Sequence, residues 1–299
     1  MIARGMSTPE IKPRSSKKTV SAPQGKTVAF QGELGAFSHS AALKILGPLA
    51  SVVACPSFRD VFEKIESGEV ESGILPIENT LHGSVHENYD RLLEYDFSIS
   101  VETSIRISHQ LIVRPGVNFR SIKRAFSHPV ALNQCQRFFE KYRQIEPVPY
   151  YDTAGSVKLL KEQDLRDAAA IASETAAGIY GGNILKANIE DNRQNFTRFF
   201  LLAKQPLFSE TASGDWKTSL VFSTANTPGA LFRAMACFAL RDLNLTKIES
   251  RPLKGKPWEY LFYVDVIGKQ TDGKMKRAFA HLSEITDFIK LLGSYRSTP

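Results

Sequence analysis

The alternation of two kinds of apolar segment constrains the fold of this chain more than any other feature. Between residues 27 and 204, short apolar runs of strand character alternate with segments whose apolar residues repeat at helical spacing. In segment 58–65 they fall at i, i+3, i+4 and i+7, which is one face of a helix that Gly68 ends. This alternation predicts an α/β layer fold with a mostly parallel sheet.

The segments of this first region can be placed one by one. We expect strands near residues 28–30, 51–54, 73–76, 99–102, 108–113, 125–127, 169–172 and 199–203. We expect helices that begin near Ser38 as N-cap, that cover 58–68, 85–93 and 132–142, and that follow Thr153. In the helix over 132–142, the spacing points Leu132, Cys135, Phe139 and Tyr142 inward.

A different order begins after residues 205–217, which lose all periodicity and predict a linker. The segments that follow alternate in the order strand, helix, strand, strand, helix, strand, over 219–223, 230–241, 245–250, 260–266, 274–283 and 288–295. This βαββαβ order is the ferredoxin-like plan, which serves enzymes and small regulatory modules alike. We therefore predict a first domain over 27–204 and a second over 218–296.

Most of the positive charge lies at the N-terminus. The formal net charge is +7, and residues 1–26 hold six Lys and Arg residues against one Glu, which leaves +2 for the rest of the chain. Binding to a phosphate backbone needs a basic stripe that such a body lacks, so we expect no nucleic-acid partner. Residues 1–26 also lack the apolar core of a secretory signal and are expected to form a disordered basic tail.

Cysteine usage indicates the compartment and excludes one kind of metal site. Cys55, Cys135 and Cys237 lie far apart with no CxxC pair, which argues against a disulfide framework and against a thiolate metal site. A reducing cytoplasm fits this usage best. No apolar run approaches the ~18 residues that a spanning helix needs, so we expect no membrane partner.

One pair of histidines has the spacing of metal ligands. His82 and His86 stand at i and i+4 on an expected helix, with Glu78 one turn earlier. A zinc-peptidase helix carries Glu directly after the first His, whereas Gly83 follows here, and no third ligand is evident. We therefore expect no metal and no other cofactor.

Polar side chains stand where expected strands end, which is where open α/β sheets bind ligands. Glu78, Asn79 and Thr80 follow the strand 73–76. Ser127 and His128 follow the strand at 125–127, and Pro129 opens the next helix. Taken singly, each has a structural interpretation: Ser127 as a helix cap, Asn79 as a turn former, Thr197 as a strand residue and Arg198 as a surface charge.

Six sequence blocks, in order along the chain, resemble those of the prephenate dehydratases. They are 28–32 with 35–38 (VAFQG, GAFS), 75–80 (LPIENT), 127–129 (SHP), 152–154 (DTA), 170–173 (AIAS) and 197–199 (TRF). Residues 218–296 resemble the ACT regulatory domain of these enzymes through 226–231 (NTPGAL) and 249–252 (ESRP). In one departure, Val130 stands where the family often has Gln, although Gln134 keeps the later amide.

This resemblance implies both a fold and an activity. The fold is a two-lobed periplasmic-binding-protein-like (type II) α/β catalytic domain, with a cleft between its lobes, followed by the ferredoxin-like ACT domain. The activity is that of a carbon–oxygen lyase (hydro-lyase), which converts prephenate to phenylpyruvate with loss of water and carbon dioxide in L-phenylalanine biosynthesis. Feedback regulation by L-phenylalanine and a homodimer or homotetramer are also implied.

The resemblance also assigns roles to residues. The family's essential hydroxyl maps to Thr197, the expected donor to the leaving hydroxyl, and Arg198 would offer charge to a carboxylate or orient the loop. Asn79 would bind the substrate, and Glu78 would order Asn79 or the substrate. Further substrate-binding residues are expected at Thr80, Ser127, Gln134 and Phe199, although Phe199 also suits packing. Effector-binding residues are expected at Asn226, Gly229, Ala230, Leu231, Glu249, Ser250 and Arg251.

Two alternatives stay open at this point. An arogenate dehydratase would have the same chemistry on a substrate with an amino group in place of the keto group. A ligand-sensing regulator of the same architecture would bind without turnover and would not need Thr197.

Overall fold

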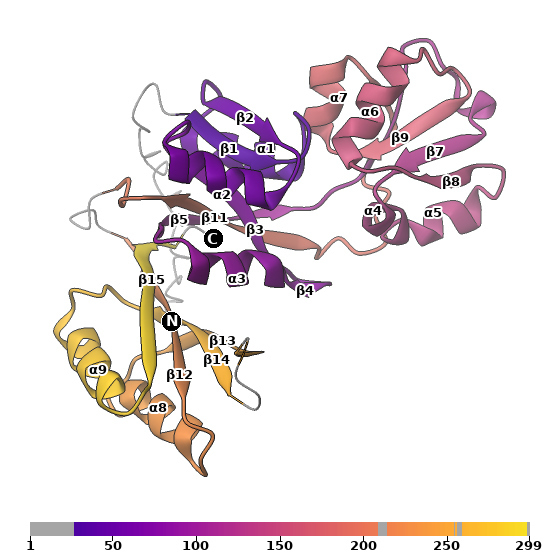
Figure 1. Cartoon of the computed structure of the whole chain (residues 1–299). Helices are drawn as coiled ribbons and strands as arrows, with labels where there is room; N and C mark the ends of the chain where they lie inside the picture. The colour runs from indigo at the N-terminus through magenta and orange to yellow at the C-terminus, as the bar shows by residue number, and fades with distance from the viewer. Residues whose placement is uncertain (1–26, 209–213, 254, 256–258, 298–299) are drawn as a thin grey trace, which may run out of the picture.

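The computed structural model describes residues 27–208, 214–253, 255 and 259–297 of the chain; the predicted tail over 1–26 and part of the predicted linker lie outside these residues. Figure 1 shows three parts: two α/β lobes joined by extended segments, and a C-terminal domain beside the first lobe. The chain enters the second lobe after strand β5 and returns along β11. We call these parts lobe 1, lobe 2 and the C-terminal domain.

Lobe 1 is a mixed sheet with helices on both faces. Its strands are β1 (Thr27–Gln31), β2 (Ser51–Cys55), β3 (Ser72–Asn79), β4 (Gly83–Ser84), β5 (Ser98–Arg106) and β11 (Phe196–Ala203), and its helices are α1 (Phe37–Leu46), α2 (Phe58–Ser67) and α3 (His86–Glu94). Apolar residues of β11 alternate between the two faces: Phe199 and Leu201 pack toward α1, and Phe200 packs toward α2 and α3.

Lobe 2 repeats this plan with a five-stranded sheet in the order β10-β6-β9-β7-β8. Its strands are β6 (Gln110–Val113), β7 (Arg124–Ser127), β8 (Glu146–Pro149), β9 (Ala168–Ala172) and β10 (Asn183–Lys186), and its helices are η1 (Phe119–Ser121), α4 (Pro129–Asn133), α5 (Gln136–Lys141), α6 (Thr153–Glu162) and α7 (Glu174–Tyr180). The Ala-rich strand β9 is wholly buried because helices cover both of its faces.

The C-terminal domain has the predicted βαββαβ order. Its elements are β12 (Trp216–Thr224), α8 (Ala230–Ala239), β13 (Leu245–Pro252), β14 (Tyr260–Ile267), α9 (Gly273–Glu284) and β15 (Phe288–Arg296). Helices α8 and α9 cover one face of the sheet. The other face contributes Tyr263 and Tyr295 to the same core as Phe62 and Tyr89 of lobe 1, so the two parts share buried apolar surface.

The sheets of lobe 1 and the C-terminal domain are continuous through β15 and β5. A Cβ atom on Gly293 would lie 2.6 Å from the carbonyl oxygen of Ile99, and Gly293 has a φ of +152°. Only glycine lets β15 approach β5 this closely. The C-terminal domain is thus fixed against the strand that neighbours β11.

Three expectations are wrong. The helix expected over 132–142 is two short helices, because the Asp191 carboxylate accepts hydrogen bonds from the backbone N–H groups of Gln136 and Arg137 and starts α5 there. Leu132 and Cys135 are buried as expected, Phe139 and Tyr142 are partly buried against the same core, and Phe138 is the ring buried in it. Ser38 lies inside α1, whose N-cap is Ala36.

The third wrong expectation is the mostly parallel sheet. In lobe 1, β1 pairs parallel with β2 and β3, while β11 pairs antiparallel with both β3 and β5. The chain leaves lobe 1 and re-enters it from lobe 2, so the returning strand runs against its neighbours. Periodicity within single segments carries no information about this crossing.

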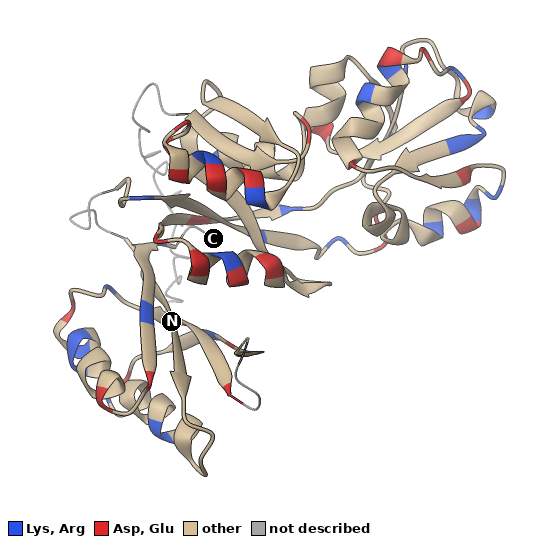
Figure 2. Ribbon diagram, viewed as in Figure 1, with Lys and Arg blue, Asp and Glu red and all other residues tan. Residues whose placement is uncertain are grey.

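Charges of both signs are interspersed on the described surface. Figure 2 shows Lys and Arg side by side with Asp and Glu on α2 and α3. None of the helices in the described residues is long and apolar enough to cross a membrane.

Candidate active site

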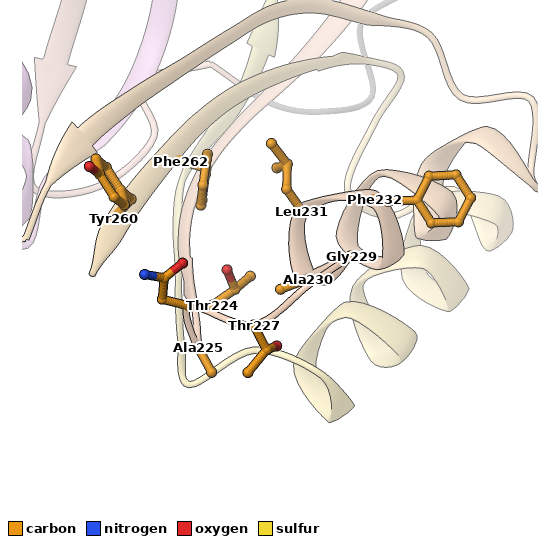
Figure 3. A pocket seen from close by; sticks show the side chains of 10 residues that line it. Thr224, Ala225, Thr227, Gly229, Ala230, Leu231, Phe232, Tyr260 and Phe262 are labelled. Carbon is orange, nitrogen blue, oxygen red and sulfur yellow. The ribbon is translucent and has the colours of Figure 1, made fainter. Parts of the chain in front are cut away.

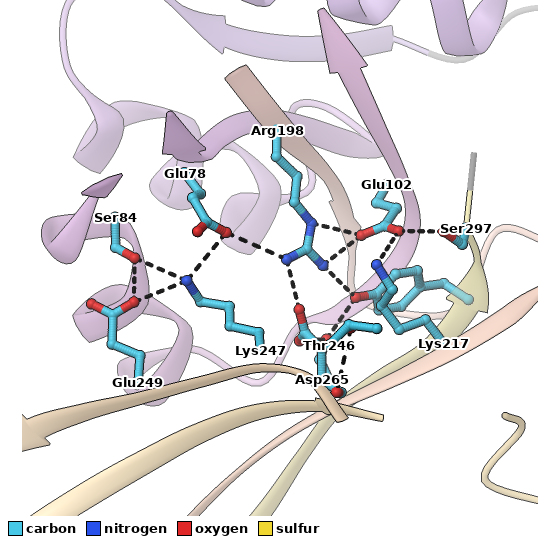
Figure 4. Close-up of polar contacts among 12 residues, drawn as sticks. Glu78, Ser84, Glu102, Arg198, Lys217, Thr246, Lys247, Glu249, Asp265 and Ser297 are labelled. Carbon is cyan, nitrogen blue, oxygen red and sulfur yellow. Dashed lines mark hydrogen bonds and ion pairs between the residues drawn. The ribbon is translucent and has the colours of Figure 1, made fainter. Parts of the chain in front are cut away.

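The ends of β3 and β11 place two pairs of residues opposite one another. Thr197 is in register with Asn79, and Arg198 with Glu78. Because side chains alternate along a strand, the two pairs point to opposite faces of the sheet. Asn79 and Thr197 face the junction of the two lobes, and Glu78 and Arg198 face the C-terminal domain (Figure 4).

Hydrogen bonds fix the orientation of the Asn79 amide. Its Oδ1 accepts from the backbone N–H groups of Leu81 and His82, at 2.9 and 3.1 Å. Its Nδ2 donates to Thr197 Oγ1 at 2.9 Å and to Asn195 Oδ1 at 2.7 Å. Thr197 therefore accepts a hydrogen bond at this site, which leaves its own hydroxyl proton available for a further acceptor.

A chain of polar side chains continues from Asn79 into lobe 2. His82 Nδ1 lies 3.1 Å from Asn79 Oδ1 and 3.3 Å from Gln134 Nε2. Gln134, at the C-terminal end of α4, also lies with its Oε1 2.8 Å from His109 Nε2. We call Thr197, Asn79, His82, Gln134 and His109 the junction network, since it connects the two lobes.

Burial keeps the far end of the junction network neutral. His109 is 1% exposed, and burial lowers the pKa of its imidazole. The His109 Nδ1 atom has no hydrogen-bond partner in the described residues. The junction network is thus built from a hydroxyl, two amides and two imidazoles, without a carboxylate or a guanidinium.

A second contact between the lobes lies at the loop after β1. Glu33 accepts hydrogen bonds from Tyr151 Oη at 2.8 Å and from Lys158 Nζ at 3.2 Å. Ser173 Oγ donates to the Gly35 carbonyl at 2.5 Å. The residues 28–38 and 170–173 of the sequence blocks therefore meet across the lobes, as residues of a shared site must.

Three residues expected at the substrate have other partners. Ser127 is fully buried, and its hydroxyl donates to the Ile171 carbonyl at 2.6 Å. Phe199 is 1% exposed and packs in the core of lobe 1. Thr80 Oγ1 donates to the Gln194 carbonyl and accepts from the Phe196 N–H, so its hydroxyl braces the segment before β11.

Arg198 and Glu78 have partners in the C-terminal domain. Arg198 donates to Glu102 of β5 and to Asp265 of the C-terminal domain, at 2.6 Å each. Glu78 Oε2 lies 3.2 Å from Lys247 Nζ of the C-terminal domain. Strand alternation explains this arrangement, because consecutive residues of a strand point to opposite faces. Of the roles expected for these two residues, orienting the loop and ordering Asn79 stay predictions.

The residues expected to bind an effector separate into two groups. Asn226, Gly229, Ala230 and Leu231 line a hollow of about 190 Å³ at the start of α8 (Figure 3). Glu249 instead hydrogen-bonds Ser84 of lobe 1, and Arg251 Nη2 lies 3.9 Å from Asp90 Oδ1 of lobe 1. Ser250 is exposed on the opposite face of β13.

Three residues of this site were missed from the sequence. Asn195 stands two residues before Thr197, so strand spacing alone places it on the same side. His82 was weighed only as a metal ligand, and the described residues contain no group of side chains suited to hold a metal. His109 carries no signal in the sequence, since only the fold brings it to Gln134.

Known proteins are similar to this chain in sequence. Residues 28–207 match the family model described as prephenate dehydratase. The chain is 44% identical over 296 residues to arogenate dehydratase/prephenate dehydratase 2, chloroplastic, of Arabidopsis thaliana, covering 95% of this chain and 77% of that protein.

Two solved structures have the same fold along most of the chain. One is prephenate dehydratase in complex with L-Phe from Arthrobacter aurescens, with 33% identity, a TM-score of 0.82 and coverage of 90% and 89% of the two chains. The other, GqqA, described as a novel type of quorum-quenching acylase, has 31% identity, a TM-score of 0.84 and coverage of 92% and 99%. These structures confirm the two-lobed periplasmic-binding-protein-like fold. This chain belongs to the prephenate dehydratase family of carbon–oxygen lyases.

Proposed function

We propose that this chain catalyses the decarboxylating dehydration of prephenate to phenylpyruvate, with Thr197 as the proton donor. The hydrogen bond of 2.9 Å from Asn79 Nδ2 to Thr197 Oγ1, on the side of lobe 1 that faces lobe 2, carries this proposal. Since Thr197 accepts from Asn79, its own proton is directed to another acceptor, and a hydroxyl that accepts a hydrogen bond is a stronger donor. The leaving hydroxyl of prephenate is the acceptor that the reaction supplies.

The reaction needs one proton and no redox step. Loss of carbon dioxide leaves an electron pair that enters the ring as it aromatises, and hydroxide leaves from the other end of the ring. Donation by Thr197 converts the departing hydroxide to water, and a proton from solvent restores the Thr197 hydroxyl. A threonine hydroxyl is a weak acid, so the geometry imposed by Asn79 and Asn195 accounts for its contribution.

The junction network gives the substrate hydrogen-bonding partners without a carboxylate. Asn79 and Gln134 remain the residues proposed to bind its polar edges, and His82 joins them because its imidazole lies between the two amides. This composition suits a dianionic substrate, since a carboxylate in the network would repel it. Ser127, Thr80 and Phe199 are not included in this proposal, because their side chains hydrogen-bond or pack within the protein.

Arogenate is the second substrate candidate, and the printed name of the Arabidopsis relative includes both activities. Incubating the purified chain with prephenate and, separately, with arogenate decides between them. Phenylpyruvate is followed by ultraviolet absorbance and phenylalanine by chromatography. We expect turnover of prephenate; turnover of arogenate alone would move the activity to arogenate dehydratase, and turnover of neither would favour a ligand-sensing regulator.

An acylase activity, as described for GqqA, is not favoured by this site. An acyl transfer needs a nucleophile activated by a base. Thr197 Oγ1 is hydrogen-bonded to an amide nitrogen, and Cys55, Cys135 and Cys237 are all buried. Burial raises the pKa of each of these three thiols, which lowers their thiolate content.

The C-terminal domain is proposed to be an ACT domain that binds L-phenylalanine. The related Arthrobacter structure contains L-Phe, and the hollow beside Gly229 offers the N-terminal N–H groups of α8 to a carboxylate. Strand β13 is the outer strand of its sheet, and Ile248 on its outward face is 50% exposed. We propose that two such domains associate there in a homodimer or homotetramer, which mass measurement in solution tests.

A cytoplasmic location remains a proposal that rests on the cysteine usage. The Arabidopsis relative is named as chloroplastic, so residues 1–26 are the segment to examine. A fluorescent fusion observed with and without these residues tests the location. A change of compartment on their removal would contradict the cytoplasmic proposal.

A further inference from the structure

The face of β3 and β11 that points away from the lobe junction carries a buried set of ions (Figure 4). Arg198, whose side chain is 15% exposed, donates from Nη1 to Asp265 Oδ2 and from Nε to Glu102 Oε2, at 2.6 Å each. Glu102 also receives Lys217 Nζ at 2.6 Å. Asp265 and Lys217 belong to the C-terminal domain, so both domains contribute to one cluster.

A second bridge reaches the neighbouring strand. Lys247 Nζ of β13 lies 3.2 Å from Glu78 Oε2 and 2.9 Å from Glu249 Oε2, and its side chain is 10% exposed. Ser84 of lobe 1 hydrogen-bonds both Lys247 and Glu249. We call this whole set the ion network; its members are Glu78, Arg198, Glu102, Lys217, Lys247, Glu249 and Asp265.

The ion network holds the residues next to the proposed catalytic pair. Arg198 follows Thr197 directly, and Glu78 precedes Asn79 directly. The β3–β11 ladder is interrupted at this point, because Arg198 pairs with Glu78 while Phe199 pairs with Pro76, which leaves Ile77 as an extra residue. Such a bulge bends the strand and re-aims the side chains beside it.

Where the backbone ladder between two strands is interrupted, side-chain contacts contribute to the orientation of the strand residues. Ile77 has no partner in the β3–β11 ladder, so the contacts of Glu78 and Arg198 add to the hydrogen bonds of Asn79 in holding the strand ends beside Asn79 and Thr197. Both are held by charges of the C-terminal domain, in a partly desolvated setting where ion pairs are stronger than at the surface. Burial alone would lower the pKa of Arg198, but Asp265, Tyr295 and Glu102 outweigh it and raise that pKa.

We propose that Asp265 and Lys247 of the C-terminal domain are positioning residues for the reaction. Asp265 holds Arg198, Lys247 holds Glu78, and together they set the approach of Asn79 Nδ2 to Thr197 Oγ1. The C-terminal domain thereby completes the active site besides carrying an effector hollow. This inference rests on the proposed function, because it takes Thr197 as the proton donor.

Asp265→Asn in the full chain tests this inference. The variant keeps the shape of the side chain and an oxygen for Ser219, but removes the charge that holds Arg198. We expect kcat for prephenate, without phenylalanine, to fall about tenfold or more while KM stays within about twofold, since misplaced catalytic groups cost rate. Lys247→Gln should lower kcat about threefold to fivefold by the same route.

The matched control is Asp242→Asn, which removes an exposed carboxylate of the same domain that pairs with Lys274 at 3.1 Å. Its kcat should stay at the parent value. An Asp265→Asn variant that melts like the parent and keeps kcat within about twofold overturns the inference. If Asp265→Asn does not fold, Lys247→Gln decides alone: an unchanged kcat overturns the inference, and a reduced kcat supports it.

A double variant separates positioning from a general loss of structure. In a Thr197→Ala background, Asp265→Asn should lower the residual kcat by less than about twofold, because its effect passes through Thr197. If the two substitutions instead lower kcat independently, so that their fold-losses multiply, Asp265 does not act through Thr197 and the inference is overturned. If Thr197→Ala alone keeps its activity, the proposed proton donor is wrong, and the kcat of Asp265→Asn still decides whether Asp265 positions the site.

Discussion

The two faces of the β3–β11 pair hold opposite kinds of side chain. The junction network on one side of this pair holds a hydroxyl, two amides and two imidazoles, whereas the ion network on the side toward the C-terminal domain holds three cations and four carboxylates. Because the junction network contains no carboxylate, it does not repel an anionic substrate, and no carboxylate in it takes up the proton of the Thr197 hydroxyl. Fixed charges suit the other face, where two domains must be held in one arrangement.

The largest effect on stability is expected from Arg198→Met. Removing this guanidinium takes the paired cation from the buried Asp265 and leaves Glu102 with Lys217, so the free energy of unfolding should fall by about 3–5 kcal/mol. Urea unfolding followed by circular dichroism measures it. Arg59→Met is the control, since its pair with Glu63 is exposed and should contribute about 1 kcal/mol or less. Equal losses in the two variants would refute a structural role for the ion network.

Thr197→Ala should instead remove activity and leave stability unchanged. Loss of one well-placed donor to a developing charge costs about 2.7–4 kcal/mol of transition-state stabilisation, which is about 100- to 1000-fold in kcat. Thr197→Ser should retain more turnover. Thr103→Ala is a matched control, because Thr103 is a buried threonine on β5 whose hydroxyl has no partner in the described residues. Turnover of Thr197→Ala within about threefold of the parent would rule out the donor role.

Gly229→Val tests whether phenylalanine binds in the effector hollow at the start of α8, apart from both faces of the β3–β11 pair. Gly229 lines the hollow and has a φ of +76°, a conformation that a β-branched residue adopts only with strain, so the valine should distort the start of α8. Calorimetry should find phenylalanine binding weakened about tenfold or more. Gly181→Val, with a φ of +70° at the end of α7, is the control for strain. Equal affinity in parent and Gly229→Val would place the effector elsewhere.

Acid should weaken the fold through its neutral histidines before it affects the ion network. Burial lowers the pKa of His39 and of His109, and His39 Nδ1 accepts a hydrogen bond from the Gly35 N–H at 3.0 Å. The unfolded chain then binds protons first, so stability is full above about pH 6.5 and falls as the pH drops below it. Burial works to raise the pKa of Glu249, but hydrogen bonds from Ser84 and Lys247 lower it, so this carboxylate stays charged.

Melting temperatures at about pH 7.5 and pH 5.5 measure this effect. We expect the parent to melt lower at the acid pH, and the double variant His39→Gln with His109→Gln to show a smaller difference between the two pH values. The same difference in parent and double variant would assign the acid sensitivity to other groups.

The smallest effect is expected from deleting residues 1–26. The deletion removes a net charge of +5 and no predicted core residue, so turnover and melting temperature should both stay at the parent values. A drop in melting temperature of several degrees would show that this segment packs against the rest of the chain.

Local pattern was sufficient to predict most elements. The helix over 58–68 and the βαββαβ order after residue 217 are confirmed, because each depends on apolar spacing within one segment. The site residues came from the family resemblance; Asn79 hydrogen-bonds Thr197 and connects through His82 to Gln134, and their roles at a substrate stay predictions. The break at Cys135 was missed because Asp191, far along the chain, caps α5.

The amino-acid sequence by itself determined which elements form, the family to which the chain belongs, and which residues stand at the ends of the strands. Only the tertiary structure decided which face each of those residues occupies and what lies against that face. Arg198 and Glu78 belong to the same short motifs as Thr197 and Asn79, yet they bond to the C-terminal domain. The physical reason is that strand geometry turns consecutive side chains to opposite faces, while the partner of each face comes from distant parts of the chain.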